Sequence, residues 1–275
     1  MIVFSLWDNI GTLMAREQSR SQSQEAATQS SSTAPSSSLA PLDLSAFSLE
    51  TFSVEIRYAT ALLLWDRAGV LWRSIQEKYP DIRIVTVEPS KTSFQRGKTA
   101  FVVELKTARI NAVDPEKSWM EEIPKVARDF FKLTIQHLEI SLCDRLGLRL
   151  VYFKEFKDRE QAASAFHAMD LVQVPDGKRF DVDQHPVNQQ YVLRWESEKK
   201  GALVQCRAET RKTDWDPPIE SVRFWGPVHR EQNGIVVDID YYTVAPVEVG
   251  QLDMGEWSKH ALHVISRDIR YLFKE

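Results

Sequence analysis

From residue 53 onward the chain alternates between two hydrophobic periods, and each period predicts a different kind of element. Residues 54–58 and 146–150 place apolar side chains at every second position, which is the period of a strand with one buried face. After each of these strands, apolar residues recur at three and four positions, which predicts helices that begin near Asp66 and Asp158. Tyr79-Pro80 is expected to end the first helix.

The same order of elements then continues in both halves of the chain. Residues 101–106 resemble residues 235–240, and each stretch is followed by a polar loop and a helix opened by Trp119 or Trp257. The second copy is longer, and its extra residues predict a hairpin in which 191–196 and 203–209 alternate around Lys199-Lys200-Gly201.

Capping residues predict where the later helices begin. Ser118 with Glu121, and Asp253 with Glu256, have the spacing of capping boxes. Pro124 is an alternative start for the first of these two helices, because proline is favoured in the first helical turn.

These patterns predict an α+β protein built from two similar β-α-β(2-3)-α units, at residues 49–144 and 145–275. We expect the units to lay their strands side by side in one curved antiparallel sheet with the helices on one face. A duplicated TATA-binding-protein-like fold has this layout, and the first unit is also compatible with a ferredoxin-like βαββαβ arrangement. The alternative is that two unrelated α+β halves share this order of elements by chance.

A break in composition separates these units from the start of the chain. Residues 15–48 are rich in Ser and Gln, which predicts a flexible linker. Residues 1–14 carry an apolar stripe at helical spacing, with Asp8 inside it and no Lys or Arg before it, unlike a signal peptide. Three interpretations remain open for this amphipathic segment: a loosely packed extension, a helix that docks on a partner, and a helix on a membrane surface.

Charge and composition narrow the class of protein. The 35 Lys and Arg residues nearly balance 39 Asp and Glu residues, with a formal net charge of −4, so no global field favours nucleic acid or an anionic membrane. The apolar stretch 59–65 is too short to cross a bilayer, and two cysteines cannot form a framework of disulfides. We therefore expect a soluble cytoplasmic protein without a transmembrane segment.

Four short segments resemble landmarks of one protein family: Val-Glu-Ile-Arg-Tyr at 54–58, the helix 71–80 that ends in Lys-Tyr-Pro, 144–151 with its Gly-Leu-Arg core, and 237–242. On these landmarks, residues 50–275 look like a sporadically distributed family of uncharacterised prokaryotic proteins of about this length. The chain has Val151-Tyr152-Phe153 where the family has Tyr followed by Asn. The resemblance implies an architecture and no established activity or catalytic residues.

Paired aspartates are the sharpest enzymatic signal. Asp238 and Asp240 share one face of a predicted strand, as Asp181 and Asp183 would, and such pairs can hold Mg²⁺ or Mn²⁺ for phosphoryl transfer. No glycine-rich phosphate loop accompanies them. The alternative, which we favour, is a solvated strand face with cationic cross-strand neighbours such as Arg149 or Arg194.

Other chemical signals are weaker. His260 and His263 have ligand-like spacing on the last helix but lack further ligands nearby, and Cys143 and Cys206 are expected to fill apolar space. No serine-hydrolase motif is present. The sequence therefore predicts no cofactor.

The predicted hairpin combines cations with aromatic side chains, as surfaces that hold phosphates and stack bases do. Trp225, in a Phe-Trp-Gly-Pro corner, extends this set. The candidate binding residues are Tyr191, Arg194, Trp195, Lys199, Lys200, Arg207, Arg211, Trp215 and Trp225. Nearby acidic residues nearly neutralise the patch, and a charged hairpin that protects a sheet edge from aggregation is the alternative.

The sequence thus favours a non-enzymatic binding protein that recognises a protein partner through an open sheet face and the aromatic hairpin. The second hypothesis is a nucleotide or nucleic-acid binding protein, with metal-assisted phosphoryl transfer at the paired aspartates.

Overall fold

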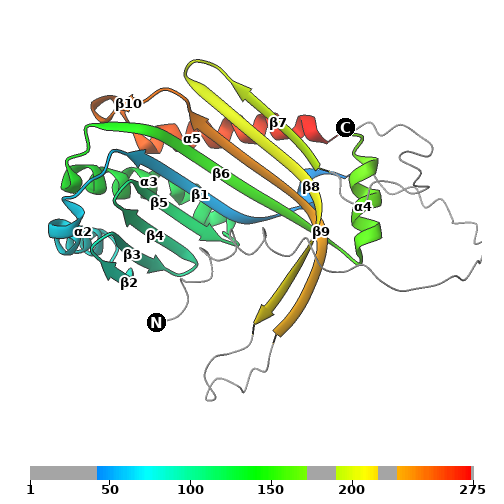
Figure 1. Ribbon diagram of the computed structural model, residues 1–275, viewed down its shortest axis with the longest axis horizontal. Helices are drawn as coiled ribbons and strands as arrows, with labels where there is room; N and C mark the ends of the chain where they lie inside the picture. The colour runs from blue at the N-terminus through cyan, green and yellow to red at the C-terminus, as the bar shows by residue number, and fades with distance from the viewer. Residues whose placement is uncertain (1–41, 172–189, 216–227, 274–275) are drawn as a thin grey trace, which may run out of the picture. The chain divides into compact units, whose positions relative to one another are not determined.

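The ten strands of the described chain form one antiparallel sheet, shown in Figure 1. The computed structural model describes residues 42–171, 190–215 and 228–273. The strands lie in the order β2-β3-β4-β5-β1-β6-β9-β8-β7, and β10 pairs with β6. Their bounds are β1 Ser48–Tyr58, β2 Arg83–Glu88, β3 Lys91–Arg96, β4 Thr99–Glu104, β5 Thr107–Val113, β6 Leu142–Phe156, β7 Gln190–Glu196, β8 Lys200–Trp215, β9 Val228–Thr243 and β10 Val247–Glu248.

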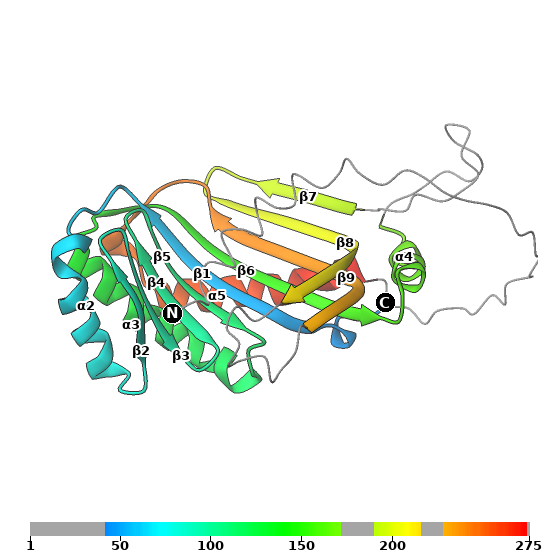
Figure 2. The same cartoon turned by 60° about the horizontal axis from the view of Figure 1, so that its bottom comes forward.

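Four α-helices in the described residues pack on one face of this sheet. They are α2 (Leu64–Lys78), α3 (Lys117–Leu138), α4 (Arg159–Ala168) and α5 (Met254–Asp268). Figure 2 shows α3 and α5 behind the sheet. Alternation along β1 explains the arrangement, because Phe52, Val54, Ile56 and Tyr58 are buried toward the helices while the residues between them are not.

Short 3₁₀ turns flank the first strand and the last helix. They span Leu44–Ala46, Val249–Gln251 and Ile269–Leu272. Phe47 is buried against the ring of Phe273, with 5.4 Å between ring centroids. The predicted linker 15–48 overlaps the described residues only at 42–48, where Leu44–Ala46 form a 3₁₀ turn and Phe47 is buried. The predicted segment 1–14 lies outside the described residues.

The central strands β1 and β6 join the two predicted units in one sheet. Val54 pairs with Leu148 and Ile56 with Leu146, so the apolar faces of both strands meet over the same core. Each of the two strands is followed by a helix, by a set of antiparallel strands whose last member returns to pair with it, and by a second helix. The sets differ in size, with four strands (β2–β5) in the first and three (β7–β9) in the second.

Several predicted elements are confirmed. Strands lie over 54–58, 146–150, 191–196 and 203–209, and α2 ends before Tyr79. Asp158 caps α4 by accepting a hydrogen bond from the Gln161 backbone, and Asp253 caps α5 through the amides of Gly255 and Glu256.

Other predictions are wrong. The polar loop expected after residue 106 is strand β5. The capping box of Ser118 and Glu121 does not form, because α3 begins at Lys117 with Glu116 as its N-cap and no side-chain cap. Pro124 lies inside α3 and does not start it.

Candidate functional site

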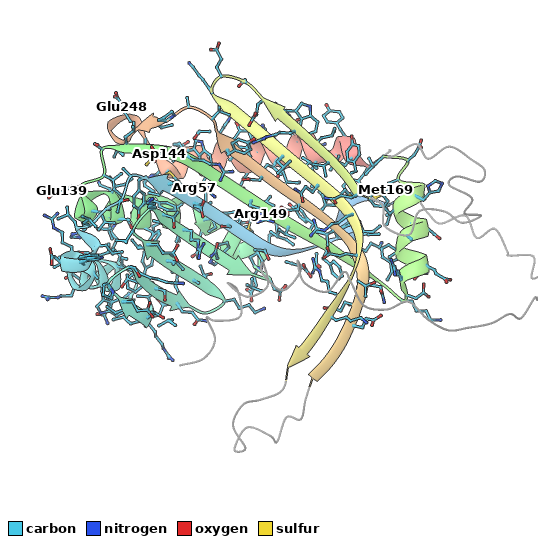
Figure 3. All side chains as sticks on the ribbon, viewed as in Figure 1. Arg57, Glu139, Asp144, Arg149, Met169 and Glu248 are labelled. Atoms are coloured by element: carbon cyan, nitrogen blue, oxygen red, sulfur yellow. The ribbon has the colours of Figure 1, made fainter. Side chains whose placement is uncertain are left out.

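The sheet face opposite the helices, which we call the open face, is not covered by any helix of the described chain (Figure 1). Along its central strands the side chains are largely charged. Arg57 and Arg149 lie over β1 and β6 in Figure 3, and each has more than half of its side chain exposed. Strand alternation places these residues here, since their neighbours on either side point into the core.

Asp238 and Asp240 both lie on this face, as predicted, and each carboxylate is held by an arginine of β6. The Arg149 Nε donates to Asp238 at 2.8 Å and its Nη2 donates to the second carboxylate oxygen at 2.5 Å. The Arg145 Nη2 donates to Asp240 at 2.6 Å. The hydrogen bonds to Asp238 raise the pKa of Arg149 above its ordinary value.

These contacts bear on the predicted metal site. Asp181 and Asp183 lie outside the described residues. Within the described residues, no group of three or more His, Cys, Asp or Glu side chains is placed to hold a metal ion. A divalent cation at Asp238 and Asp240 would have to displace two guanidinium groups. The cross-strand partnership of Asp238 with Arg149 is confirmed.

Tyr242 is the centre of a second group on the open face. Its register partners are Gly147 on β6 and Gly201 on β8, and its ring lies against Gly201, where a Cβ would come within 2.5 Å of the ring. The Arg145 guanidinium carbon lies 4.6 Å from the ring centroid, a cation–π distance. The hydroxyl accepts from Arg194 Nε at 3.0 Å and donates to Glu196 at 2.7 Å.

A third group forms where β8 and β9 leave the sheet as a two-stranded arm, visible in Figure 1 below the sheet. The Arg211 guanidinium carbon lies 4.3 Å from the ring centroid of Phe153, and its Nη1 donates to Glu50 of β1 at 2.6 Å. Glu209 also accepts from Arg211. Because β1 and β8 are not neighbours in the sheet, the arm must curve over the open face to make this contact.

Strand alternation divides the candidate binding residues between two faces. Arg194, Arg207 and Arg211 lie on the open face, where each pairs with a glutamate. The register places Tyr191 opposite Cys206 and Trp195 opposite Ala202, which belong to the helix side. The structure therefore does not bring these two aromatic side chains together with the three arginines.

The remaining candidate residues lie near the hairpin ends. Lys199 is in the β7–β8 turn, and the Lys200 Nζ lies 3.2 Å from His260 Nε2 on α5. Trp215 is the last residue of β8, and its side chain is not among those that the structure describes. Trp225 lies outside the described residues altogether.

His260 and the cysteines have different surroundings. Partial burial, followed by the nearby Lys200, His263 and Arg267, lowers the pKa of His260. Burial raises the pKa of Cys143 to about 11 and that of Cys206 to about 12, which keeps both thiols protonated near neutral pH. Both cysteines fill apolar space, as predicted.

Sequence reasoning missed Tyr242, Phe153 and Glu50 as members of this surface. A usable signal exists for Tyr242, because glycines are unusual inside strands and commonly mark a close approach. Gly147 and Gly201 both lie within strands and flank Tyr242. Glu50 had no local signal, since its partner Arg211 is distant in sequence.

None of the helices in residues 42–171, 190–215 and 228–273 is long and apolar enough to span a membrane. No protein-family model matches the chain, and no curated protein is significantly similar to it.

Proposed function

We propose that this chain is a non-enzymatic binding protein whose open face, together with the β7–β8 hairpin, contacts a protein partner. The observation that carries the proposal is the broad uncovered face on which arginines are held over aromatic rings by carboxylates. Side chains that are already fixed lose little conformational freedom on binding, so such a face is prearranged for contact. Arginine and tyrosine are also enriched at protein interfaces.

The balance of charge favours a protein over a polyphosphate. Arg57, Arg145, Arg149, Arg194, Arg207 and Arg211 each have a carboxylate partner within 4.0 Å on the same face. A nucleic-acid surface needs excess positive charge to release counterions from phosphates, and here the carboxylates offset it. Mixed charge of this kind fits the polar part of a protein interface.

The repeated order of elements supports the proposal at the level of the fold. We infer that the chain is an internal duplication, in which β1 and β6 are equivalent and meet as antiparallel neighbours at the centre of the sheet. By pairing, β9 is equivalent to β5, since both are the returning strands that pair with the first strand of their unit. The sequence likeness of 101–106 to 235–240 would instead align β9 with β4, so it does not follow this topology. The resemblance of residues 50–275 to a prokaryotic family stays a prediction.

The experiment is affinity capture from cells that express the protein, comparing the wild type with the double variant Arg149→Met, Asp238→Asn. The double change removes a charged pair from the open face without leaving a buried charge unpaired. We expect the partner that the wild type captures to be missing from the material captured by the double variant. The matched control is Arg128→Met on α3, which removes an exposed arginine from the helix side and should keep the partner.

The aromatic part of the hairpin is tested by Trp195→Ala, because Trp195 has 51% of its surface exposed on the edge strand β7. Retention of the partner should fall while the thermal midpoint stays unchanged. Capture that survives both open-face and hairpin variants would contradict the proposal. Capture that disappears with nuclease or in high salt would instead support the nucleic-acid hypothesis.

A further inference from the structure

Strands β3, β4 and β5 carry a row of side chains across the open face, at the end of the sheet away from the β7–β8 hairpin (Figure 1). Ser93 pairs with Val102, and Val102 pairs with Arg109. Phe94 and Ile110 belong to the core under the helices, so strand alternation places Ser93 and Arg109 on the opposite, open side. The polar side chains at this row form what we call the Arg109 site: Lys91, Ser93, Glu104 and Arg109.

Two polar atoms of this row are buried without a hydrogen-bond partner in the described chain. Ser93 has 0% of its surface exposed, and its Oγ is unpaired. The Nε of Arg109 is likewise buried and unpaired. A third atom of this kind, the Oγ1 of Thr92, lies on the helix side of β3. Because proteins pair almost all of their buried polar groups, two unpaired atoms in one row of the sheet favour a site that an added group completes.

The charge of the Arg109 site is also incomplete. The Glu104 Oε1 lies 3.5 Å from the Lys91 Nζ and 3.7 Å from the Arg109 Nη2, so one carboxylate serves two cations. The other oxygen of Glu104 accepts from the Thr107 hydroxyl at 2.9 Å. Both cations reach the surface, since 21% of the Lys91 side chain and 32% of the Arg109 side chain are exposed. Within the site, one positive charge is therefore left over at the surface.

Arg149 on the same face shows the contacts of an arginine with a complete partner. Its Nε and Nη2 donate to the two oxygens of Asp238 at 2.8 Å and 2.5 Å. Arg109 has the same two nitrogens, but its Nε has no acceptor in the described chain and its Nη2 lies beyond hydrogen-bond distance of Glu104. The open-face arginines described above each have a carboxylate oxygen within 3.0 Å: Arg57, Arg145, Arg149, Arg194, Arg207 and Arg211.

We propose that the partner protein places the carboxylate of an Asp or Glu side chain on the Nε and Nη2 of Arg109, in the way that Asp238 binds Arg149. This inference rests on the proposed function, because it names the chemical group that the partner brings to the open face. A carboxylate has two oxygens and accepts only, which matches the two parallel donors of a guanidinium. Its single negative charge also equals the positive charge left over at the site.

A nucleic-acid phosphate fits the Arg109 site less well, because its neighbours along the strand are charged too. Glu104 lies within the site, and Glu55 faces Arg109 across the β1–β5 pair. Phosphates brought close to these carboxylates would be repelled, and such like-charge contacts suppress wrong partners. The site therefore suits one isolated carboxylate.

A titration with a defined acidic peptide tests the inference without knowledge of the partner. The probe is hexaglutamate with both ends blocked, and hexaglutamine blocked in the same way is the control peptide. Each peptide is added to the full chain labelled with nitrogen-15, and the side-chain Nε–H signals of the arginines are followed by NMR. The signals that disappear in Arg109→Met and in Arg57→Met assign these two residues.

We expect hexaglutamate to move the Arg109 signal in the direction of stronger hydrogen bonding. The Arg57 signal should stay nearly unchanged, because its Nε already donates to Glu55 at 2.6 Å. In Arg109→Met the affinity for the peptide, measured by fluorescence anisotropy, should fall about tenfold or more, since a bidentate charged contact is lost. Arg57→Met is the matched control, which removes the same charge from the same face and should bind the peptide as the wild type does.

The same variants report on stability. Arg109→Met should keep the thermal midpoint of the wild type, because it removes a donor that the described residues leave without an acceptor. If the variant nevertheless loses its fold, Arg109→Lys replaces it in the titration, since lysine keeps the charge but lacks the two parallel donors.

An Arg109 signal that does not move, or a peptide affinity that falls equally in Arg109→Met and Arg57→Met, would overturn the inference. Inorganic phosphate that moves the Arg109 signal at a lower concentration than hexaglutamate would also overturn it, because the site would then select phosphate. Neither result bears on the proposed function, which fails only if capture of the partner survives the open-face and hairpin variants described above.

Discussion

The carboxylate of Asp238 is almost fully buried, yet its partner Arg149 is half exposed, so the pair connects the interior of the sheet to its surface. Asparagine at position 238 would offer Arg149 one neutral acceptor oxygen in place of two charged ones, and its amide NH2 would face a guanidinium N–H. Hydrogen bonds to charged groups contribute more to the free energy of unfolding than hydrogen bonds between neutral groups do. Solvent around the exposed Arg149 reduces that contribution.

We therefore predict that Asp238→Asn lowers the free energy of unfolding by about 1–2 kcal/mol, measured by urea denaturation. Lys98→Ala is the control, because Lys98 and Asp114 form an ion pair that is mostly exposed on both sides. The control should unfold at nearly the same urea concentration as the wild type. An equal shift in both variants would show that the open-face pair behaves like an ordinary surface pair.

A second prediction at the scale of residues concerns the pKa of His260. Its pKa lies below the ordinary 6.5, chiefly from partial burial and then from Lys200. Lys200→Met should raise this pKa part of the way back, measured by NMR titration of the imidazole protons, whereas Lys199→Met should not. A His260 pKa that does not respond to Lys200→Met would show that burial, His263 and Arg267 set it without Lys200.

The sign of the effect on stability follows from linkage. The unfolded chain takes up a proton at His260 before the folded chain does as the pH falls. The contribution of His260 to stability is therefore complete above pH 6.5 and is lost as the pH falls through the lowered folded pKa.

At the scale of elements, two glycines within helices have different surroundings. A Cβ on Gly69 in α2 would meet nothing within 4 Å, whereas a Cβ on Gly255 in α5 would lie 2.7 Å from the Pro124 carbonyl oxygen of α3. Gly255 therefore allows α5 to approach α3 closely, and Gly69 has no such role in the described residues.

We predict that Gly69→Ala stabilises the protein by about 0.5–1 kcal/mol, since alanine loses less conformational entropy in a helix. Gly255→Ala should destabilise it by about 1–3 kcal/mol through overpacking. Thermal unfolding followed by circular dichroism measures both. A loss of stability in Gly69→Ala would mean that something outside the described residues packs against that position.

A comparison of the elements with the sequence shows which of them local patterns can predict. Alternation located β1, β6 and the β7–β8 hairpin, and two side-chain caps located α4 and α5, because each of these signals is local. Strand β5 was missed since its buried face is built from Ala108, Ile110 and Ala112, and small alanines give a weak apolar signal.

The open-face residues were predicted only in part, because only some of their features depend on local sequence. A period of two places Asp238 and Asp240 on one face without any knowledge of neighbours. Their partners depend on strand register, and β1 and β6 shift register at Leu49/Thr51 and at Arg57/Tyr58. Such irregularities, and the curvature that brings Arg211 to Glu50, are long-range properties that one sequence does not display.

At the scale of the whole molecule, the sheet is continuous from β2 to β7 through the β1–β6 pair, so the two halves should unfold together. Leu148 is fully buried in β6 at this junction. We predict that Leu148→Ala lowers the free energy of unfolding by about 2–5 kcal/mol, as cavities in cores do.

Hydrogen exchange measured by mass spectrometry checks whether the halves are coupled. In Leu148→Ala the protection of β4 and of β8 should fall by the same factor, because both depend on one cooperative unit. Loss of protection in β8 alone would show that the halves unfold separately.

The position of β1 has a mechanical consequence. This strand is the first long element after residues 1–41, and it is hydrogen-bonded to β5 on one side and to β6 on the other. A force applied through the start of the chain acts along β1 and loads both ladders in shear, so their bonds must break together and not one after another. Sliding β1 lengthwise out of the sheet is therefore more costly than peeling away the edge strand β2, which has a ladder on one side only.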